Sequence, residues 1–371
     1  MGVVDSRLGL RAGRGGNLVH DVAVAAAGFV ELGHSHRTTH QSGQCHPTRV
    51  RFARSDSWPH CVPRDVSKGK ILVIRGGAIG DFVLTLPAIA ALRQQFPHAH
   101  IEVLGYPHIV QLAQAAGLVD RVQAIEARGL AGFFARGGEL SEDLRDYFSE
   151  FNIIVSYLYD PDEIFKTNVA LCSPGQFIVG PYRPNEFENI HATKVFLKPL
   201  ERLAIFDADS IPRLALDPRP SPLNHCLCLH PGSGSERKNW PEEKWEQLIA
   251  RLLNETNANL IMVGGEAEGE RLQRLAAALP PMRCAVVRNL PLAELAKRIT
   301  TCASFIGHDS GITHIAAAVG VPTIALWAET VEEIWRPQGK RVTVLREPQG
   351  IQHISVDQVM KAIELSSGYK N

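Results

Sequence analysis

The sequence lacks the features that would place it in a membrane or nucleic-acid-binding class. None of its apolar runs approaches the roughly eighteen residues that a membrane-spanning helix needs. Lys and Arg number 39, and Asp and Glu also number 39, so no excess of basic charge favours nucleic acid. The best candidate for a signal peptide, 22–30, follows His20 and Asp21 and has no convincing cleavage site. We predict a soluble, cytoplasmic protein.

Regular cysteine spacing is also missing. The seven cysteines form no pattern, and a chain of 371 residues needs no disulfide framework to hold its core. We therefore expect free thiols in a reducing compartment. Cys226, Cys228 and His230 alternate along one segment and, with His308, could suggest a metal site. A buried strand with small side chains is the preferred interpretation, and we predict no bound metal.

Residues 1–68 differ from the rest of the chain. They hold six of the fifteen histidines and no sustained apolar period, which predicts a disordered extension. Their His and Cys residues could hold a metal, although the spacings fit no familiar zinc pattern. A misassigned translation start is a further alternative for this stretch.

From Lys70 onward, short apolar strands alternate with helical stretches. Ile71-Leu72-Val73-Ile74 is a continuous apolar run, typical of a parallel strand buried on both faces, and a glycine turn follows it. Thr85 is expected to cap the next helix, which Pro97 ends. This alternation predicts an α/β fold with parallel sheets.

A proline-rich segment interrupts the alternation once and predicts an extended linker. The expected organisation is two Rossmann-like domains in tandem, with ligands bound at the carboxyl ends of their strands. The boundaries are 69–215 for the first domain, 216–224 for the linker, 225–350 for the second domain, and 351–371 for a C-terminal helix and tail.

Two strand-to-helix turns are candidates for anion binding. Segments 230–241 and 307–314 place Gly and Ser before a helix N-terminus, where unpaired N–H groups favour a pyrophosphate. Lys238 adds a positive charge beside the first of them. The sequence has no P-loop, and the turn at 75–81 lacks the G-x-G-x-x-G dinucleotide fingerprint. We therefore favour a mononucleotide-type ligand in the second domain.

Four ordered segments match one family. They are ILVIRGGAIGDFVLTLPAIAALRQQFP, LHPGSGSERKNWPEEKW, GGEAEGERLQRLA and FIGHDSGITHIAAAVGVPTIALW. Together they resemble glycosyltransferase family 9, the bacterial ADP-heptose:lipopolysaccharide heptosyltransferases, from about Lys70 to the C-terminus. The resemblance implies the GT-B architecture, with two Rossmann-like domains facing a cleft, the donor nucleotide in the C-terminal domain and the acceptor in the N-terminal one.

The resemblance also implies a reaction. Heptose, or a similar sugar, is transferred from an ADP-sugar to a lipopolysaccharide core or related glycan, with inversion and without a metal. The acceptor is lipid-linked, so peripheral contact with the inner face of the cytoplasmic membrane is expected. The ADP-sugar is a substrate, and no cofactor is implied.

One residue carries the catalytic role in this resemblance. Asp81 matches the family's catalytic aspartate, although its carboxylate could merely favour a helix N-terminus. Asp160-Pro161-Asp162 and Asp207-Ala208-Asp209 imitate the D-x-D metal motif of another glycosyltransferase class. We interpret both as solvated turn residues.

The remaining matched residues belong to the donor site. Ser233 and Lys238 match residues that face the donor's phosphates and sugar, and Glu268 falls where an acidic residue reaches the nucleoside, with Glu266 as the alternative. Gly234 departs from the pattern because a second hydroxyl residue is frequent there. His314 could instead be a packing residue. The block around the pyrophosphate is matched by Asp309, Ser310, Gly311 and His314.

Two rival functions remain. A nucleotide-sugar epimerase shares the two-domain architecture and acts on a UDP-sugar without an acceptor. A catalytically silent sugar-nucleotide-binding protein is the other, and the presence of Asp81 argues against it.

Overall fold

The computed structural model describes residues 69–216, 225–265, 268–277 and 279–367. The predicted disordered extension and nearly all of the predicted linker lie outside these residues, as does Glu266. Within the described residues, no helix is both long and apolar enough to cross a membrane.

The first sheet has five parallel strands in the order β3-β2-β1-β4-β5. In its centre, Ile71 pairs with Ile101 on one side and with Ile153 on the other. The strands are β1 (Lys70–Arg75), β2 (His100–Gly105), β3 (Arg121–Ala124), β4 (Ile153–Ser156) and β5 (Gln176–Val179). The helices between and after them are α1 (Ile79–Gln95), α2 (Pro107–Ala115), η1 (Arg128–Phe134), α3 (Glu142–Ser149), α4 (Ile164–Ala170), α5 (Ala192–Leu197) and η2 (Lys198–Leu203).

The second sheet has six parallel strands in the order β11-β10-β9-β6-β7-β8. The strands are β6 (Cys226–His230), β7 (Asn259–Gly264), β8 (Cys284–Arg288), β9 (Ser304–His308), β10 (Thr323–Trp327) and β11 (Val342–Arg346). The helices are η3 (Glu236–Lys238), α6 (Glu242–Glu255), α7 (Gly269–Ala276), α8 (Leu292–Thr300), α9 (Gly311–Ala318), α10 (Glu332–Trp335), η4 (Ile351–His353) and α11 (Val356–Ser367).

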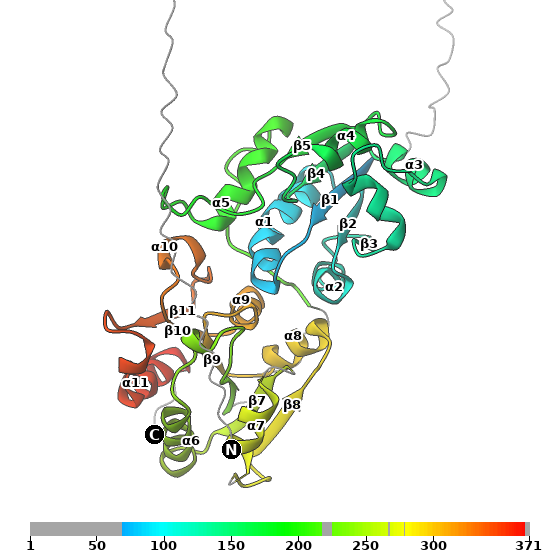
Figure 1. Ribbon diagram of the computed structural model, residues 1–371. Coiled ribbons are helices and arrows are strands. Elements are labelled where there is room, and N and C mark those ends of the chain that lie inside the picture. Colours follow the sequence, from blue (N-terminus) through cyan, green and yellow to red (C-terminus); the bar gives the residue numbers. More distant parts are fainter. Residues whose placement is uncertain (1–68, 217–224, 266–267, 278, 368–371) are drawn as a thin grey trace, which may run out of the picture. The chain divides into compact units, whose positions relative to one another are not determined.

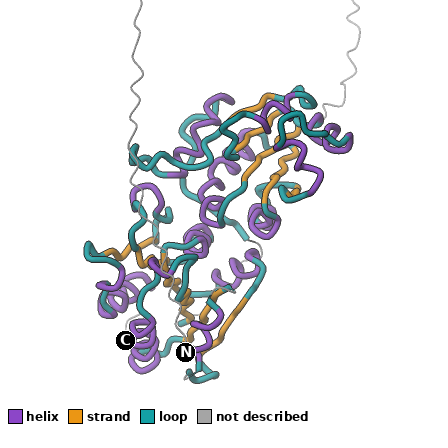
Figure 2. Tube along the Cα trace, in the orientation of Figure 1, coloured by secondary structure: helices purple, strands orange, loops and turns teal. Residues whose placement is uncertain are grey.

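Both sheets are buried on both faces, as the continuous apolar strands predict. In β1, Ile71 and Val73 face one hydrophobic cluster, whereas Leu72 and Ile74 face another. Because side chains alternate along a strand, the two clusters lie on opposite faces of the sheet and helices pack on each (Figures 1 and 2). In β6, Cys226 and Cys228 are buried in one such cluster, which confirms the buried-strand interpretation of these small residues.

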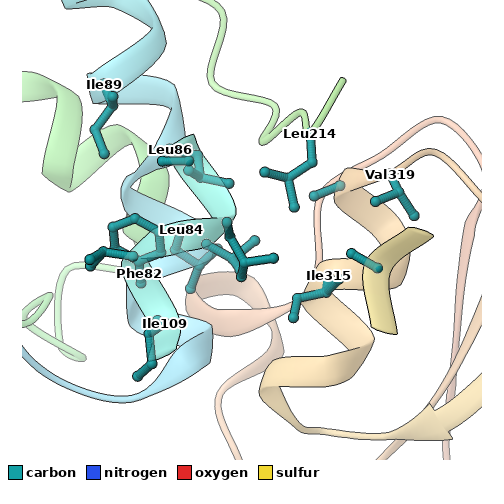
Figure 3. Packing of buried hydrophobic residues seen from close by; sticks show 14 of the residues in the cluster. Phe82, Leu84, Leu86, Ile89, Ile109, Leu214, Ile315 and Val319 are labelled. Carbon is teal, nitrogen blue, oxygen red and sulfur yellow. The ribbon is translucent and has the colours of Figure 1, made fainter. Parts of the chain in front are cut away.

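The two sheets belong to one compact unit, Pro63–Asn371, in which we call residues 69–216 the N-terminal lobe and residues 225–367 the C-terminal lobe. One hydrophobic cluster runs through both lobes. Figure 3 shows Leu84 and Leu86 of α1 on one side of this cluster and Ile315 and Val319 on the α9 side. The cluster therefore joins α1 to α9.

Glycine allows α1 and α9 to meet closely. A Cβ added to Gly311 would lie 2.5 Å from the Cβ of Ile79 and 3.0 Å from the backbone N of Gly80. A Cβ on Gly80 would in turn lie 3.5 Å from the His314 ring. Any larger residue at Gly311 would push the two helix N-termini apart.

Some local predictions were wrong. Thr85 does not cap α1, because the helix already begins at Ile79 and the Thr85 hydroxyl donates to the carbonyl oxygen of Asp81 at 2.8 Å. Pro87 lies inside the helix. Residues 192–203 form two pieces, α5 and η2, and Pro199 stands at the start of the second, where its missing N–H disfavours a continuous α-helix.

Candidate active site

A cavity of about 1200 Å³ lies between loops that follow strands of both sheets. Because all the strands of a parallel sheet end at the same edge, loops far apart in the sequence meet here. A second cavity of about 240 Å³ lies at the ends of β6 and β7. Ser310 and Gly311 line both cavities, so the two spaces adjoin at the N-terminus of α9.

Asp81 lies in the first turn of α1 and faces the large cavity. Its Oδ2 accepts a hydrogen bond from the backbone N of Ala78 at 3.1 Å, which fixes the side-chain rotamer. The side chain remains 31% exposed. One oxygen of the carboxylate therefore accepts from the backbone at the start of α1, and the carboxylate remains accessible to a ligand in the cavity.

Arg75, the last residue of β1, is buried next to Asp81. Its side chain is only 2% exposed, and its Nη2 lies 3.8 Å from Asp81 Oδ1. The guanidinium donates to the carbonyl oxygens of Tyr182 at 2.9 Å and Tyr157 at 3.3 Å, and it lies over the Phe196 ring at 4.6 Å. Burial lowers the pKa of this guanidinium from its ordinary value, and the charge of Asp81 opposes that shift.

On the opposite wall, Lys238 and Asp309 form an ion pair. Lys238 Nζ lies 2.6 Å from Asp309 Oδ2, and the Thr330 hydroxyl donates to the same oxygen. The Asp309 side chain is 8% exposed, whereas Lys238 is 34% exposed. The lysine charge is therefore held at the cavity surface by a buried carboxylate.

A buried histidine fixes the loop that carries Lys238. His308 accepts from the backbone N of Trp240 at 2.9 Å through Nε2, and its Nδ1 lies 3.1 Å from the carbonyl oxygen of Gly232. Burial lowers the pKa of His308 to about 3, so the ring is neutral with its proton on Nδ1. Both ring nitrogens are thus used by the fold.

The N-terminus of α9 is capped by Ser310. Its Oγ lies 3.2 Å from the Thr313 hydroxyl and 3.4 Å from Nδ1 of His230, whose pKa burial lowers to about 4. His314, one turn into the helix, is buried and lines the large cavity, and desolvation lowers its pKa as well. The side chains at the N-terminus of α9 are therefore neutral, and they lie beside the backbone N–H groups of its first turn.

Ser233 and Glu268 line the smaller cavity. Glu268 accepts from the backbone N of Gly265 at 2.8 Å, and its Cγ is 2.0 Å from the position that a Cβ on Gly232 would take. Ser233 Oγ lies 2.8 Å from the carbonyl oxygen of Ser235 and 2.9 Å from Asn239 Oδ1. The structure thus separates Ser233 from Lys238, which lines the large cavity.

Both D-x-D imitations lie in loops outside helices and strands, where Asp160 and Asp209 accept hydrogen bonds from the backbone. Asp160 accepts from the backbone N of Phe165 and Lys166 at 3.1 and 3.0 Å, at the start of α4. Asp209 accepts from the backbone N of Ile211 and pairs with Arg213 at 2.7 Å. In the described part of the chain, no group of three or more His, Cys, Asp or Glu side chains could hold a metal ion.

Comparison with known proteins bears on the family and the fold of the chain. The sequence model of glycosyltransferase family 9 (heptosyltransferase) matches residues 209–362. Lipopolysaccharide heptosyltransferase 3 of Escherichia coli is 24% identical over 287 residues, which are 70% of this chain and 82% of that protein. Lipopolysaccharide heptosyltransferase 1 of Pseudomonas aeruginosa is 38% identical over 106 residues, 29% of each chain. The chain is a glycosyltransferase, and residues 209–362 are similar to family 9.

The fold of this glycosyltransferase is the expected GT-B fold. An E. coli heptosyltransferase solved with ADP superimposes with a TM-score of 0.65 at 19% identity, over 80% of this chain and 99% of that one. The prediction of two Rossmann-like parallel sheets facing a cleft is therefore confirmed.

Sequence reasoning missed part of the site of this glycosyltransferase. Arg75 could have been noticed, because a charged residue directly after four apolar ones ends a buried strand at the ligand edge. Tyr159 and Tyr182 line the large cavity from loops after β4 and β5, and Trp335 of α10 lines it too. These aromatic residues have no motif around them, so no signal in a single sequence distinguishes them.

Proposed function

We propose that this glycosyltransferase moves heptose, or a similar sugar, from an ADP-sugar to a lipopolysaccharide core or related glycan. One observation carries the proposal: Asp81 from one lobe and the Lys238–Asp309 pair from the other line the same cavity. A transfer between two sugars needs a base beside the acceptor hydroxyl and a positive site for the departing diphosphate. The two walls supply these groups separately.

The adjoining cavities match the parts of an ADP-sugar. The smaller one takes the adenosine, with the Glu268 carboxylate available to ribose hydroxyls. The diphosphate crosses Ser310 and Gly311, which line both spaces, and receives N–H groups from the first turn of α9. Lys238 then lies on the sugar side of the diphosphate.

The reaction is a single displacement with inversion at the anomeric carbon. The acceptor oxygen attacks that carbon from the face opposite the diphosphate, and Asp81 takes the hydroxyl proton. The bond from the anomeric carbon to the diphosphate oxygen breaks, and ADP leaves with the bonding electron pair. Lys238 and the α9 amides stabilise the charge on ADP, which is the role that a metal ion has in other enzymes.

The acceptor is expected to be lipid-linked. The reaction then takes place at the cytoplasmic face of the inner membrane, with the enzyme bound peripherally. Co-sedimentation of the protein with vesicles that contain the acceptor lipid, compared with vesicles without it, tests this part of the proposal.

The donor and the stereochemistry are tested together. Thermal shifts with ADP-, GDP- and UDP-sugars should be largest for the ADP-sugars. With ADP-heptose and a lipopolysaccharide-core acceptor, ADP release should persist in EDTA, and NMR should show a product of opposite anomeric configuration. A UDP-sugar epimerised without acceptor would instead favour the epimerase. Binding of an ADP-sugar without turnover of any donor would favour the silent protein.

A further inference from the structure

Two tyrosine rings stand exposed on the N-terminal wall of the large cavity. Tyr159 is 67% exposed and Tyr182 is 49% exposed, and their ring centroids lie 4.7 Å apart at an interplanar angle of 64°. Rings of this size are usually buried, so an exposed pair that lines a cavity is a marker of ligand binding.

The pair is held in a fixed relation to Asp81. Tyr159 follows β4 and Tyr182 follows β5, and β4 is the neighbour of β1, which leads to Asp81. The buried Arg75 guanidinium bonds to the carbonyl oxygens of Tyr182 at 2.9 Å and Asp81 at 3.4 Å. The Arg75 side chain therefore links the loop that carries Tyr182 to the first turn of α1, which carries the proposed base Asp81.

The side-chain charges of this wall do not favour an anionic ligand. Among the described residues of the N-terminal lobe that line the cavity, the cations are Arg75 and Arg183. Arg75 is buried beside Asp81, and Arg183 is paired with Glu186 at 2.6 Å. The carboxylates on the same wall are Asp81, Glu126 and Glu186. The wall thus offers more negative than positive side chains.

We propose that Tyr159 and Tyr182 form the stacking surface for an uncharged pyranose ring of the acceptor, the ring that presents its hydroxyl to Asp81. A pyranose has an apolar C–H face that packs on an aromatic ring, while its hydroxyls remain free for polar partners. A phosphorylated or carboxylated ring would meet the carboxylates of this wall without a free cation. This inference rests on the proposed glycosyl transfer and specifies its acceptor.

The test uses the full chain with saturating ADP and small probe acceptors. Saturation-transfer NMR and titration compare a methyl hexopyranoside, a methyl heptopyranoside and the 6-phosphate of the methyl hexopyranoside. We expect the neutral glycosides to bind more tightly than the phosphate. Tyr159→Ala or Tyr182→Ala should weaken neutral-glycoside binding about five- to tenfold, whereas Tyr159→Phe, which keeps the ring, should retain it.

Phe206→Ala is the matched control, because Phe206 is 64% exposed and is not among the cavity-lining residues. The proposal is overturned if the phosphate binds more tightly than its neutral parent, if wild type binds no neutral glycoside, or if both alanine variants bind as wild type does. Should the alanine variants fail to fold, the comparison of neutral and phosphorylated probes on wild type decides. Loss of ADP binding or of ADP-heptose turnover in wild type is a separate result, which would count against the proposed function.

Discussion

On the C-terminal wall of the large cavity, Lys238, Asp309 and Thr330 are bonded to one another, whereas the N-terminal wall exposes the rings of Tyr159 and Tyr182. His308, Asp309 and Lys238 are each held by specific partners in the C-terminal lobe. The rings of Tyr159 and Tyr182 contact each other and are both largely exposed. A pre-formed wall suits a constant ligand such as a nucleotide, and an open wall can change with the acceptor.

Asp81→Asn is the sharpest test of the difference between the two walls. The amide keeps the oxygen that accepts from Ala78 but cannot take a proton, so kcat should fall about 10²–10⁴-fold. ADP affinity should not change, because the donor wall is intact. Calorimetry and initial rates at saturating substrates measure the two quantities.

Asp209→Asn, in an exposed pair with Arg213, is the control for that substitution. If Asp81→Asn turned over within a few-fold of wild type, Asp81 would be only the residue that closes the start of α1.

Removing the lysine of the opposite wall should affect binding instead. Lys238→Ala removes the charge that we propose contacts the diphosphate, and it should weaken ADP binding about ten- to a hundredfold. Calorimetry with ADP measures this directly. Lys297→Ala, which removes a surface lysine paired with Glu294, should leave the affinity unchanged. Equal ADP affinity in wild type and Lys238→Ala would remove Lys238 from the site.

A single methyl group added where α1 and α9 meet should lower the stability of the protein. Gly311→Ala places a Cβ 2.5 Å from that of Ile79, and such overpacking should lower the free energy of unfolding by about 1–3 kcal/mol. Gly234→Ala adds the same methyl where nothing lies within 4 Å, so it should be nearly neutral. Urea titrations of the two variants compare them, and equal stability would mean that the lobes separate without cost.

The smallest expected effect is the pH dependence of stability. Burial lowers the pKa of His230 to about 4 and of His308 to about 3. The unfolded chain, in which histidine titrates near about 6.5, binds these protons first, so Tm should fall as the pH drops from about 6.5 towards 4. His308→Gln should reduce this fall of Tm at low pH, whereas His98→Gln, at an exposed position, should not. An unchanged slope in His308→Gln would assign the acid sensitivity to other groups.

The difference between the two cavity walls also explains which parts of the site could be predicted from the sequence. The two sheets and most helices follow from apolar strands and strong stop signals such as Pro97, and the proposed donor residues lie in turns with a recognisable spacing. The start of α1 was misjudged because Asp81, three positions after Ala78, closes the helix from inside its first turn. The tyrosine pair could not be found, because strand order alone places β4 next to β1 and β5 next to β4.

The contact between Gly311 and the Ile79–Gly80 backbone has an electrostatic consequence. It brings two helix N-termini together, and each carries the equivalent of roughly half a positive charge from its aligned peptide dipoles. The two ends together place about one positive unit beside the cavity, where Gly80 and Gly311 line it. This field belongs to the backbone and survives every side-chain substitution that leaves the two helices in place. A glycosyltransferase built in this way could change its side chains extensively and still attract an anion to the same point.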